Sequence, residues 1–291
     1  LIASGSSGPT TATFLDWDRA ILEKLGDLAD YISLHRYVGN HEDDTASFLG
    51  VSNSIDKQIE DVDAVCRYTA AKNRQKKRSY LCFDEWNVWY KTFKPGKMNG
   101  SGKFAQPIIE EEYNLEDALV VASFLMSFIR HADIVKIANL AQLVNVIAPL
   151  LTRHDDILKQ STFHAFKMLS NRQGGVSLRS KVVSPRYNTE LYGSVNYLDQ
   201  AVTLDKNTLN LFLINRALDK PLEVKVTTDL TIERAINCEI LHHENPKARN
   251  TFENREEVVN KRFDHVALKR DSAIFSIPPL SLIGCTLAIQ R

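Results

Sequence analysis

The sequence predicts two kinds of fold in succession, an α/β part over residues 1–174 and an all-β part over residues 175–291. In the first part, short apolar runs alternate with longer amphipathic stretches, which is typical of a parallel sheet covered by helices. In the second part, apolar residues recur at every second position, which indicates antiparallel strands. Gly174 and Gly175 separate the two patterns, so we place the domain boundary there.

The first part contains four predicted pairs of strand and helix. We expect strands at residues 1–4, 31–34, 80–83 and 135–140. Amphipathic helical patterns occupy residues 17–28, 55–72, 115–131 and 163–169. A closed (β/α)8 barrel needs eight such pairs, so the pattern alone leaves two possibilities, a small open sheet or half of a barrel.

The second part contains at least six predicted strands with no helix between them. We expect these strands at residues 201–204, 209–213, 222–226, 236–241, 273–277 and 282–289. Turn-forming residues separate some of the strands, as at 205–207 and 219–221. Short strands joined in this way predict an antiparallel β-sandwich.

Charge and hydropathy argue against several classes of protein. The 291 residues include 36 basic and 36 acidic side chains, so no net field attracts nucleic acid or anionic lipid. No apolar run approaches the roughly 18 residues that a membrane-spanning helix needs. We therefore expect a soluble protein that binds no nucleic acid and no membrane. The N-terminal residues lack a signal-peptide pattern, and we expect a cytoplasmic location.

The cysteines and the N-terminus lead to two further expectations. The four cysteines are widely scattered without metal-ligand spacing, and we expect free buried thiols at Cys66, Cys82, Cys238 and Cys285. The chain begins with Leu1 rather than methionine, and its first residues have the pattern of a strand followed by a loop. We interpret the chain as a fragment of a longer protein.

Residues 79–90 carry the most informative pattern. An apolar strand leads into Asp84 and Glu85, and an aromatic cluster that includes Trp89 follows. Parallel α/β barrels place their catalytic groups at the C-terminal ends of strands. A carboxylate can attack the anomeric carbon of a sugar, while aromatic faces pack against sugar rings. The alternative is that both acids cap the next helix and the aromatic residues belong to the core.

Neighbouring strands are predicted to add polar groups at the same end of the sheet. His35 and Tyr37 are two residues apart, so both side chains point to one side and could orient a carboxylate. Taken alone, His35 is more typical of a buried core histidine. Gln142 follows the fourth strand, and convergence of three strand ends favours a binding pocket. By the same alternation, we expect only one of Asp84 and Glu85 to face this pocket.

A family resemblance is carried by residues 1–7, 31–40, 83–90, 135–147, 244–247 and 250–254. Its most specific stretches are residues 83–90 and 138–147. Together these segments resemble the α-L-arabinofuranosidases of glycoside hydrolase family 51, over essentially the whole chain. The resemblance implies that residues 1–174 form strands five to eight of a (β/α)8 TIM barrel, and that residues 175–291 form a jelly-roll β-sandwich.

The resemblance also implies a role for particular residues. Glu85 matches the catalytic nucleophile, and Tyr37 matches a tyrosine beside it. Gln142 matches a residue that contacts the sugar, Trp89 matches an aromatic residue that lines the pocket, and His35 is a neighbouring rim residue. Family members are retaining exo-enzymes that release non-reducing terminal α-L-arabinofuranosyl groups from arabinan, arabinoxylan and arabino-oligosaccharides. The resemblance implies no metal, no organic cofactor, and a homo-oligomer inside the cell.

One catalytic group has no match in the sequence. Retention needs a second carboxyl group about 5 to 5.5 Å from the first, to act as acid and then as base. In the family this glutamate follows an asparagine at the end of strand four, and no Asn-Glu pair occurs in the 291 residues. Glu42 is the nearest substitute, but it lies in the loop after strand six, at the wrong place around the barrel. We therefore expect the chain alone to be inactive.

Two other functions remain open from the sequence. The chain could be a non-catalytic module that binds glycan or supports assembly, and the coding sequence upstream of Leu1 would distinguish this from an enzyme. A metal-dependent barrel hydrolase is less favoured, because His35 lacks a second histidine at ligand spacing.

Overall fold

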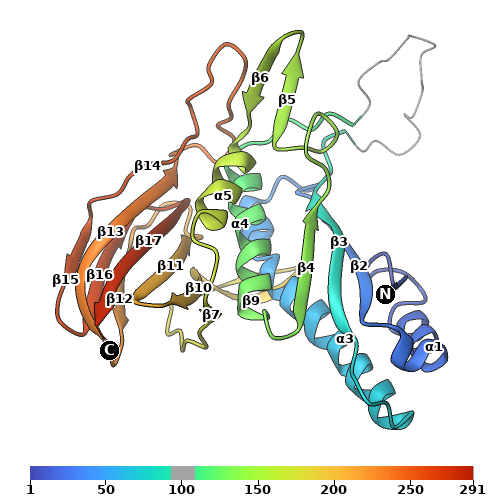
Figure 1. The fold of residues 1–291 in the computed structure, drawn as a ribbon. Coiled ribbons are helices and arrows are strands. Elements are labelled where there is room, and N and C mark those ends of the chain that lie inside the picture. Colours follow the sequence, from blue (N-terminus) through green and yellow to red (C-terminus); the bar gives the residue numbers. More distant parts are fainter. Residues whose placement is uncertain (93–108, 291) are drawn as a thin grey trace.

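The computed structural model describes residues 1–92 and 109–290. In the first half, these residues form a four-stranded parallel sheet in the order β1 (Ile2–Ala3), β2 (Tyr31–Val38), β3 (Tyr80–Val88) and β4 (Val135–Leu140). Helical segments connect the strands (Figure 1), namely α1 (Asp16–Leu25), η1 (Gly26–Leu28), α2 (Thr45–Leu49), α3 (Ser52–Lys72) and α4 (Leu115–Arg130). The predicted parallel sheet with helical connections is present.

Strands β2 and β3 extend further than the sequence predicts. They end at Val38 and Val88, whereas the apolar runs end at residues 34 and 83. Backbone pairing continues beyond those runs through polar and aromatic residues. The candidate residues His35, Tyr37 and Glu85 therefore lie within paired strands, which hold their backbones more firmly than loops would.

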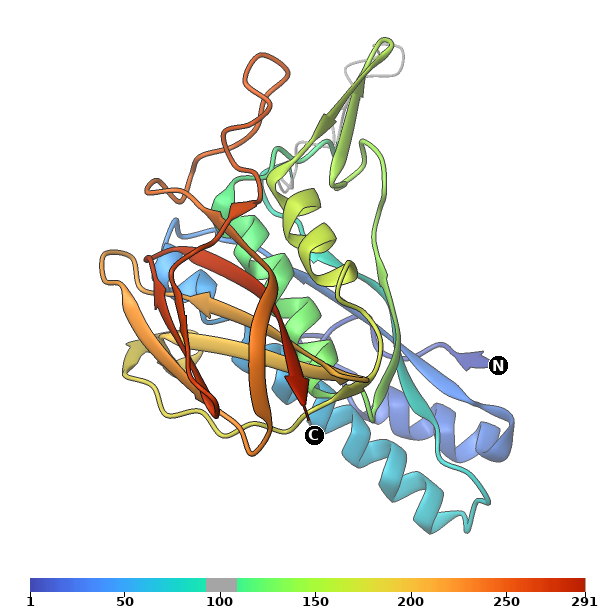
Figure 2. The same ribbon diagram turned by 60° about the vertical axis from the view of Figure 1, so that its left-hand side comes forward.

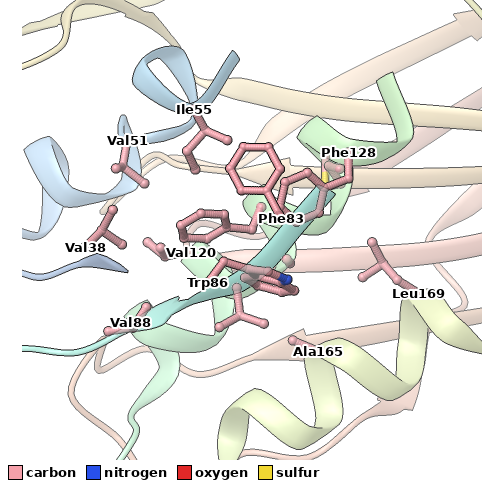
Figure 3. Packing of buried hydrophobic residues seen from close by; sticks show 14 of the residues in the cluster. Val38, Val51, Ile55, Phe83, Trp86, Val88, Val120, Phe128, Ala165 and Leu169 are labelled. Atoms are coloured by element: carbon pink, nitrogen blue, oxygen red, sulfur yellow. The ribbon is translucent and has the colours of Figure 1, made fainter. Parts of the chain in front are cut away.

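Helix α4 lies between the parallel sheet and the strands of the second half (Figures 1 and 2). Nearly all of its side chains are buried, as expected for a helix with apolar residues on every side. Phe83 and Trp86 of β3 pack against Phe128 of α4, with ring centroids 4.9 and 5.2 Å apart (Figure 3). These aromatic contacts hold β3 against α4, and the C-terminal end of β3 remains available for the candidate site.

Within the described residues, the second half contains two larger antiparallel sheets and a two-stranded one. The six-stranded sheet has the order β14 (Lys261–Arg262), β13 (Thr231–His242), β17 (Ser281–Gln290), β11 (Thr208–Asn215), β10 (Leu198–Asp205) and β7 (Val176–Ser177). The three-stranded sheet has the order β12 (Leu222–Thr227), β16 (Ser272–Ile277) and β15 (Val266–Leu268). Each predicted strand of this half overlaps one of these strands.

Strand β11 is buried on both faces, which explains its almost continuous apolar sequence. Leu211 and Leu213 contribute to the core between the two sheets. Phe212 and Ile214 alternate with them and contribute to the core that includes α4 and the parallel sheet. Alternate side chains of β11 thus enter two different cores, and the strand connects the two halves of the molecule in this way.

Several elements were not predicted, namely helix α2, strands β14 and β15, and three further elements. Two of these three are hairpins, formed by β5 (Leu150–Arg153) with β6 (Asp156–Lys159) and by β8 (Arg186–Thr189) with β9 (Gly193–Asn196). The third is strand β7, which joins the edge of the six-stranded sheet. Helix α5 (Ser161–Ser170) forms where a helix was expected, packs against α4 and precedes this strand.

The expectation of four free thiols is wrong for two cysteines. Cys238 of β13 lies directly opposite Cys285 of β17 in the antiparallel register, and the two form a disulfide. The pairing depends on the register of strands that are distant in sequence, which the spacing of cysteines does not reveal. Cys66 and Cys82 are buried free thiols, as expected.

Candidate active site

The candidate site lies at the C-terminal ends of β2 and β3, where backbone pairing becomes irregular. Leu34 pairs with Phe83, but the next residue, His35, pairs with Glu85, so that Asp84 is an extra residue in β3. A β-bulge of this kind interrupts the regular alternation of side chains between the two faces of a sheet. It therefore changes the directions of both acidic side chains.

His35 lies between the two acids. Its Nε2 atom is 3.3 Å from Oδ1 of Asp84, and its Nδ1 atom is 3.5 Å from Oε2 of Glu85. Both carboxylates therefore approach one imidazole, at different ring nitrogens, and the expectation that only one acid faces the pocket stays a prediction. The Glu85 side chain is 48% exposed, so a ligand can reach it.

Tyr37 holds one oxygen of Glu85. Its hydroxyl donates a hydrogen bond to Oε2 of Glu85 at 3.1 Å. Burial, and then the negative charge of Glu85, raises the pKa of Tyr37 well above its usual range. The phenol therefore keeps its proton and remains a donor to the carboxylate.

Of the aromatic residues after Glu85, Trp89 lies in the site and Trp86 in the core. The rings of Trp89 and Tyr37 meet edge to face, with centroids 5.5 Å apart. Trp86 is fully buried and packs against Phe124 of α4 at 5.0 Å. The aromatic cluster is thus divided between the candidate site and the hydrophobic core.

Gln142 lies just beyond β4, at the same end of the sheet, but apart from the cluster of acids. Its side chain is exposed and forms no hydrogen bond with a described residue. Its backbone is placed by Asn87, whose amide donates to the carbonyl oxygens of Ala141 and Ile147 at 2.7 and 2.5 Å. The structure therefore brings His35, Tyr37, Glu85 and Trp89 together and leaves Gln142 beside them.

Sequence reasoning missed Asn87 and the contact of Asp84 with His35. Asn87 is buried and holds the segment after β4, yet it occurs inside the same acidic and aromatic stretch that identified Glu85. A polar residue between two apolar positions of a strand was the available signal. No signal in the sequence indicated the contact of Asp84 with His35, because that contact depends on the bulge.

Neither a metal centre nor a membrane-spanning helix is found within residues 1–92 and 109–290. In those ranges, no three histidine, cysteine or acidic side chains are grouped so as to hold a metal ion. No helix in the same ranges is long and apolar enough to cross a membrane.

Comparison with known proteins identifies the family. Residues 84–281 match the family model of the α-L-arabinofuranosidase C-terminal domain. The chain belongs to the α-L-arabinofuranosidases of glycoside hydrolase family 51. The match includes Glu85, Trp89 and Gln142, whereas His35 and Tyr37 precede it.

Curated relatives of this family-51 chain include two intracellular exo-α-(1→5)-L-arabinofuranosidases. The protein from Halalkalibacterium halodurans is 39% identical over 262 residues, covering 89% of this chain and 52% of the relative. The Bacillus subtilis protein is 37% identical over 289 residues, covering 97% of this chain and 57% of the relative. The chain thus spans about half the length of the curated relatives it matches, and it aligns with their C-terminal portion.

Solved structures give the same result. A family 51 α-L-arabinofuranosidase from Bifidobacterium longum superimposes with a TM-score of 0.87 and 28% identity, covering 99% of this chain and 59% of that protein. An arabinose complex of the Thermotoga maritima α-L-arabinofuranosidase gives a TM-score of 0.81 at 25% identity, covering 99% and 57%. The arrangement of strands and helices is therefore that of the C-terminal portion of this arabinofuranosidase family.

Proposed function

We propose that this family-51 chain supplies the nucleophile of a retaining α-L-arabinofuranosidase, with Glu85 as the attacking carboxylate. The substrate class is glycan with non-reducing terminal α-L-arabinofuranosyl groups, such as arabinan, arabinoxylan and arabino-oligosaccharides. The observation that carries the proposal is the hydrogen bond from Tyr37 to Glu85 at the ends of adjacent parallel strands. Tyr37, Trp89, Gln142 and His35 are the proposed substrate-binding residues.

The contacts of Glu85 assign different roles to its two oxygens. Oε2 accepts the hydrogen bond from Tyr37 and lies next to His35, which leaves Oε1 to attack the anomeric carbon. As the bond from that carbon to Oε1 forms, the bond to the leaving oxygen breaks, and a second carboxyl group gives that oxygen a proton. Water then attacks the anomeric carbon, gives its proton to the second carboxylate and releases Glu85.

The second carboxyl group is proposed to lie outside the 291 residues. Glu42 stands in the loop between β2 and α2, and it is exposed. We propose that residues 1–174 form the second half of a (β/α)8 barrel, that residues 175–291 form a jelly-roll sandwich, and that a first barrel half supplies the acid/base. A homo-oligomer in the cytoplasm is proposed for the complete protein, in keeping with relatives that are named intracellular.

Reconstitution tests this function directly. Residues 1–291 are produced alone and together with the N-terminal half of the Halalkalibacterium halodurans relative, and 4-nitrophenyl α-L-arabinofuranoside is the substrate. We expect nitrophenol release from the combined halves and none from either half, because retention requires both carboxyl groups. Full activity of residues 1–291 alone would contradict the proposed location of the acid/base. A combined protein that binds arabino-oligosaccharide without cleaving it would instead favour a glycan-binding module.

A further inference from the structure

The loop that follows β13 reaches across to the N-terminus of α4. The backbone N–H groups of Leu115 and Glu116 donate to the carbonyl oxygens of Ala248 and Pro246, at 2.9 and 3.1 Å. These N–H groups lie in the first turn of the helix, where no intrahelical acceptor exists. The loop therefore completes the hydrogen bonding of α4 with groups from the antiparallel half of the chain.

Lys247 of the same loop contacts a carboxylate that is inaccessible to solvent. Its Nζ atom is 2.6 Å from Oε1 of Glu116, which is 0% exposed, and it also pairs with Asp43. Burial opposes the charged form of Lys247, but its bonds to Asp43 and Glu116 outweigh this and raise the pKa of its ammonium. A buried carboxylate requires a cation or several donors.

Glu116 collects further donors from the rim of the candidate site. Thr45 Oγ1 and Asn40 Nδ2 donate to its Oε2 at 2.6 and 3.3 Å, and the Tyr90 hydroxyl donates to its Oε1 at 3.4 Å. Asn40 lies three residues after Tyr37, and Tyr90 follows Trp89. The carboxylate of Glu116 thus holds in place the segments that follow Tyr37 and Trp89, which are two of the proposed substrate-binding residues.

The two rim segments also pack tightly against each other. A Cβ atom at Gly39 would overlap Cβ of Tyr90, so the backbone there approaches as closely as glycine allows. The backbone N–H of Trp89 donates to the carbonyl oxygen of Val38 at 2.9 Å. A shift of Tyr90 would therefore move both Trp89 and the segment that begins at Val38.

We infer that Lys247 is a positioning residue of the active site, which acts through Glu116 to hold Tyr37 and Trp89 beside Glu85. The antiparallel half of the molecule thereby contributes to the geometry of catalysis without touching the substrate. This inference rests on the proposed function in one respect, the expected effect on kcat. The placement of Trp89 is a separate consequence that can be measured without activity.

The first experiment measures that placement in the 291-residue chain. The chain has three tryptophans, so labelling with 5-fluorotryptophan gives three ¹⁹F signals, assigned with Trp→Phe variants. We expect Lys247→Met to move the Trp89 signal by more than its line width and to leave the Trp17 signal in place. Lys247→Arg, which keeps a cation, should return the Trp89 signal toward its wild-type position.

Arg249→Met is the matched control. Arg249 lies on the same loop and pairs with Glu112, but both side chains are largely exposed and neither contacts Glu116. We expect all three ¹⁹F signals to stay unchanged in this variant. If Lys247→Met does not fold, Thr45→Val removes another donor to Glu116 and is expected to move the same Trp89 signal.

The second experiment uses the chain combined with the N-terminal half of the relative. We expect Lys247→Met to lower kcat about tenfold, within the range for residues that act through a packed network, and to change KM much less. An unmoved Trp89 signal in Lys247→Met, or an equal effect of Arg249→Met, would overturn the inference. An inactive wild-type combination would count against the proposed function, while the ¹⁹F result would still decide the role of Lys247.

Discussion

His35 is placed so that its two ring nitrogens approach different acids. Asp84 lies at the Nε2 side and Glu85 at the Nδ1 side. A carboxylate on the far side of an imidazole fixes the orientation of the ring and selects which nitrogen carries the hydrogen. Asp84 thus has a proposed role through His35, and Glu85 has the direct one.

This difference predicts the effect of replacing each acid. In the combined protein, Glu85→Ala should abolish turnover because no covalent intermediate can form, and azide should restore part of it by attacking the vacated face of the sugar. Asp84→Asn should lower kcat/KM less, because Asp84 acts only through His35, whose Nε2 atom is 3.3 Å from Oδ1 of Asp84. The assay is hydrolysis of 4-nitrophenyl α-L-arabinofuranoside with and without azide. A larger loss in Asp84→Asn than in Glu85→Ala would mean that the nucleophile is Asp84.

Tyr37 permits a second prediction at the scale of one hydrogen bond. Tyr37→Phe removes the donor to Oε2 of Glu85 but preserves the ring that packs against Trp89. We expect kcat to fall about ten- to a hundredfold, since hydrogen bonds to charged groups contribute roughly 1.5 to 3 kcal/mol, while KM changes little. Steady-state kinetics of the combined protein separate the two parameters. A change confined to KM would show that Tyr37 contributes only to substrate binding.

Helix α4 begins with a reciprocal pair of side-chain bonds. The Asn114 side chain accepts from the backbone N–H of Asp117 at 3.1 Å, and the Asp117 carboxylate accepts from the N–H of Asn114 at 2.9 Å. This capping box satisfies two donors at the N-terminus. Burial raises the pKa of Asp117 to about 6, although the adjacent Lys91 acts in the opposite direction.

The raised pKa of Asp117 predicts a pH dependence of stability. Between about pH 4 and pH 6 the unfolded chain loses this proton while the folded chain keeps it, so this group lowers the free energy of unfolding as pH rises. The expected loss is about 2 to 3 kcal/mol, at roughly 1.4 kcal/mol per pKa unit. Urea unfolding of the chain at pH 4 and pH 6 isolates this contribution as the difference between wild type and Asp117→Asn, because the other carboxylates contribute equally to both. The exposed Asp219→Asn serves as control, and an unchanged pH slope in Asp117→Asn would contradict the prediction.

Elements with a long regular pattern could be predicted from the sequence, and details that depend on distant partners could not. The period of 3.6 identified α3 and α4, and the period of two identified β11. The pattern did not show the bulge at Asp84, because a bulge depends on the register of β2 against β3. For the same reason it identified His35, Tyr37 and Glu85 as candidates without giving their contacts.

At the scale of the molecule, the parallel sheet has two free edges within the described residues. Strand β1 pairs only with β2, and β4 pairs only with β3. Exposed apolar side chains lie near both edges, at Leu1, Ile2, Leu143 and Val144. Unpaired strand edges with apolar residues favour association with other chains.

These edges predict the solution behaviour of the chain alone. We expect residues 1–291 to self-associate increasingly with concentration in sedimentation velocity, and the N-terminal half of the relative to suppress this association by covering the edges. An unrelated helical protein at the same concentration is the control for crowding. A monomer at all concentrations, with no effect of the N-terminal half, would show that the edges are not exposed as binding surfaces.

The contact of Lys247 with Glu116 also sets an order of events during synthesis on the ribosome. The two residues are 131 positions apart, so at ~5–20 residues per second the ribosome needs roughly 7 to 26 s to pass from one codon to the other. During that interval the nascent helix α4 has neither the lysine nor the two carbonyl groups that complete its first turn. The rim of the active site therefore reaches its final form only after Lys247 has been made, although Tyr37 and Glu85 are made well before it.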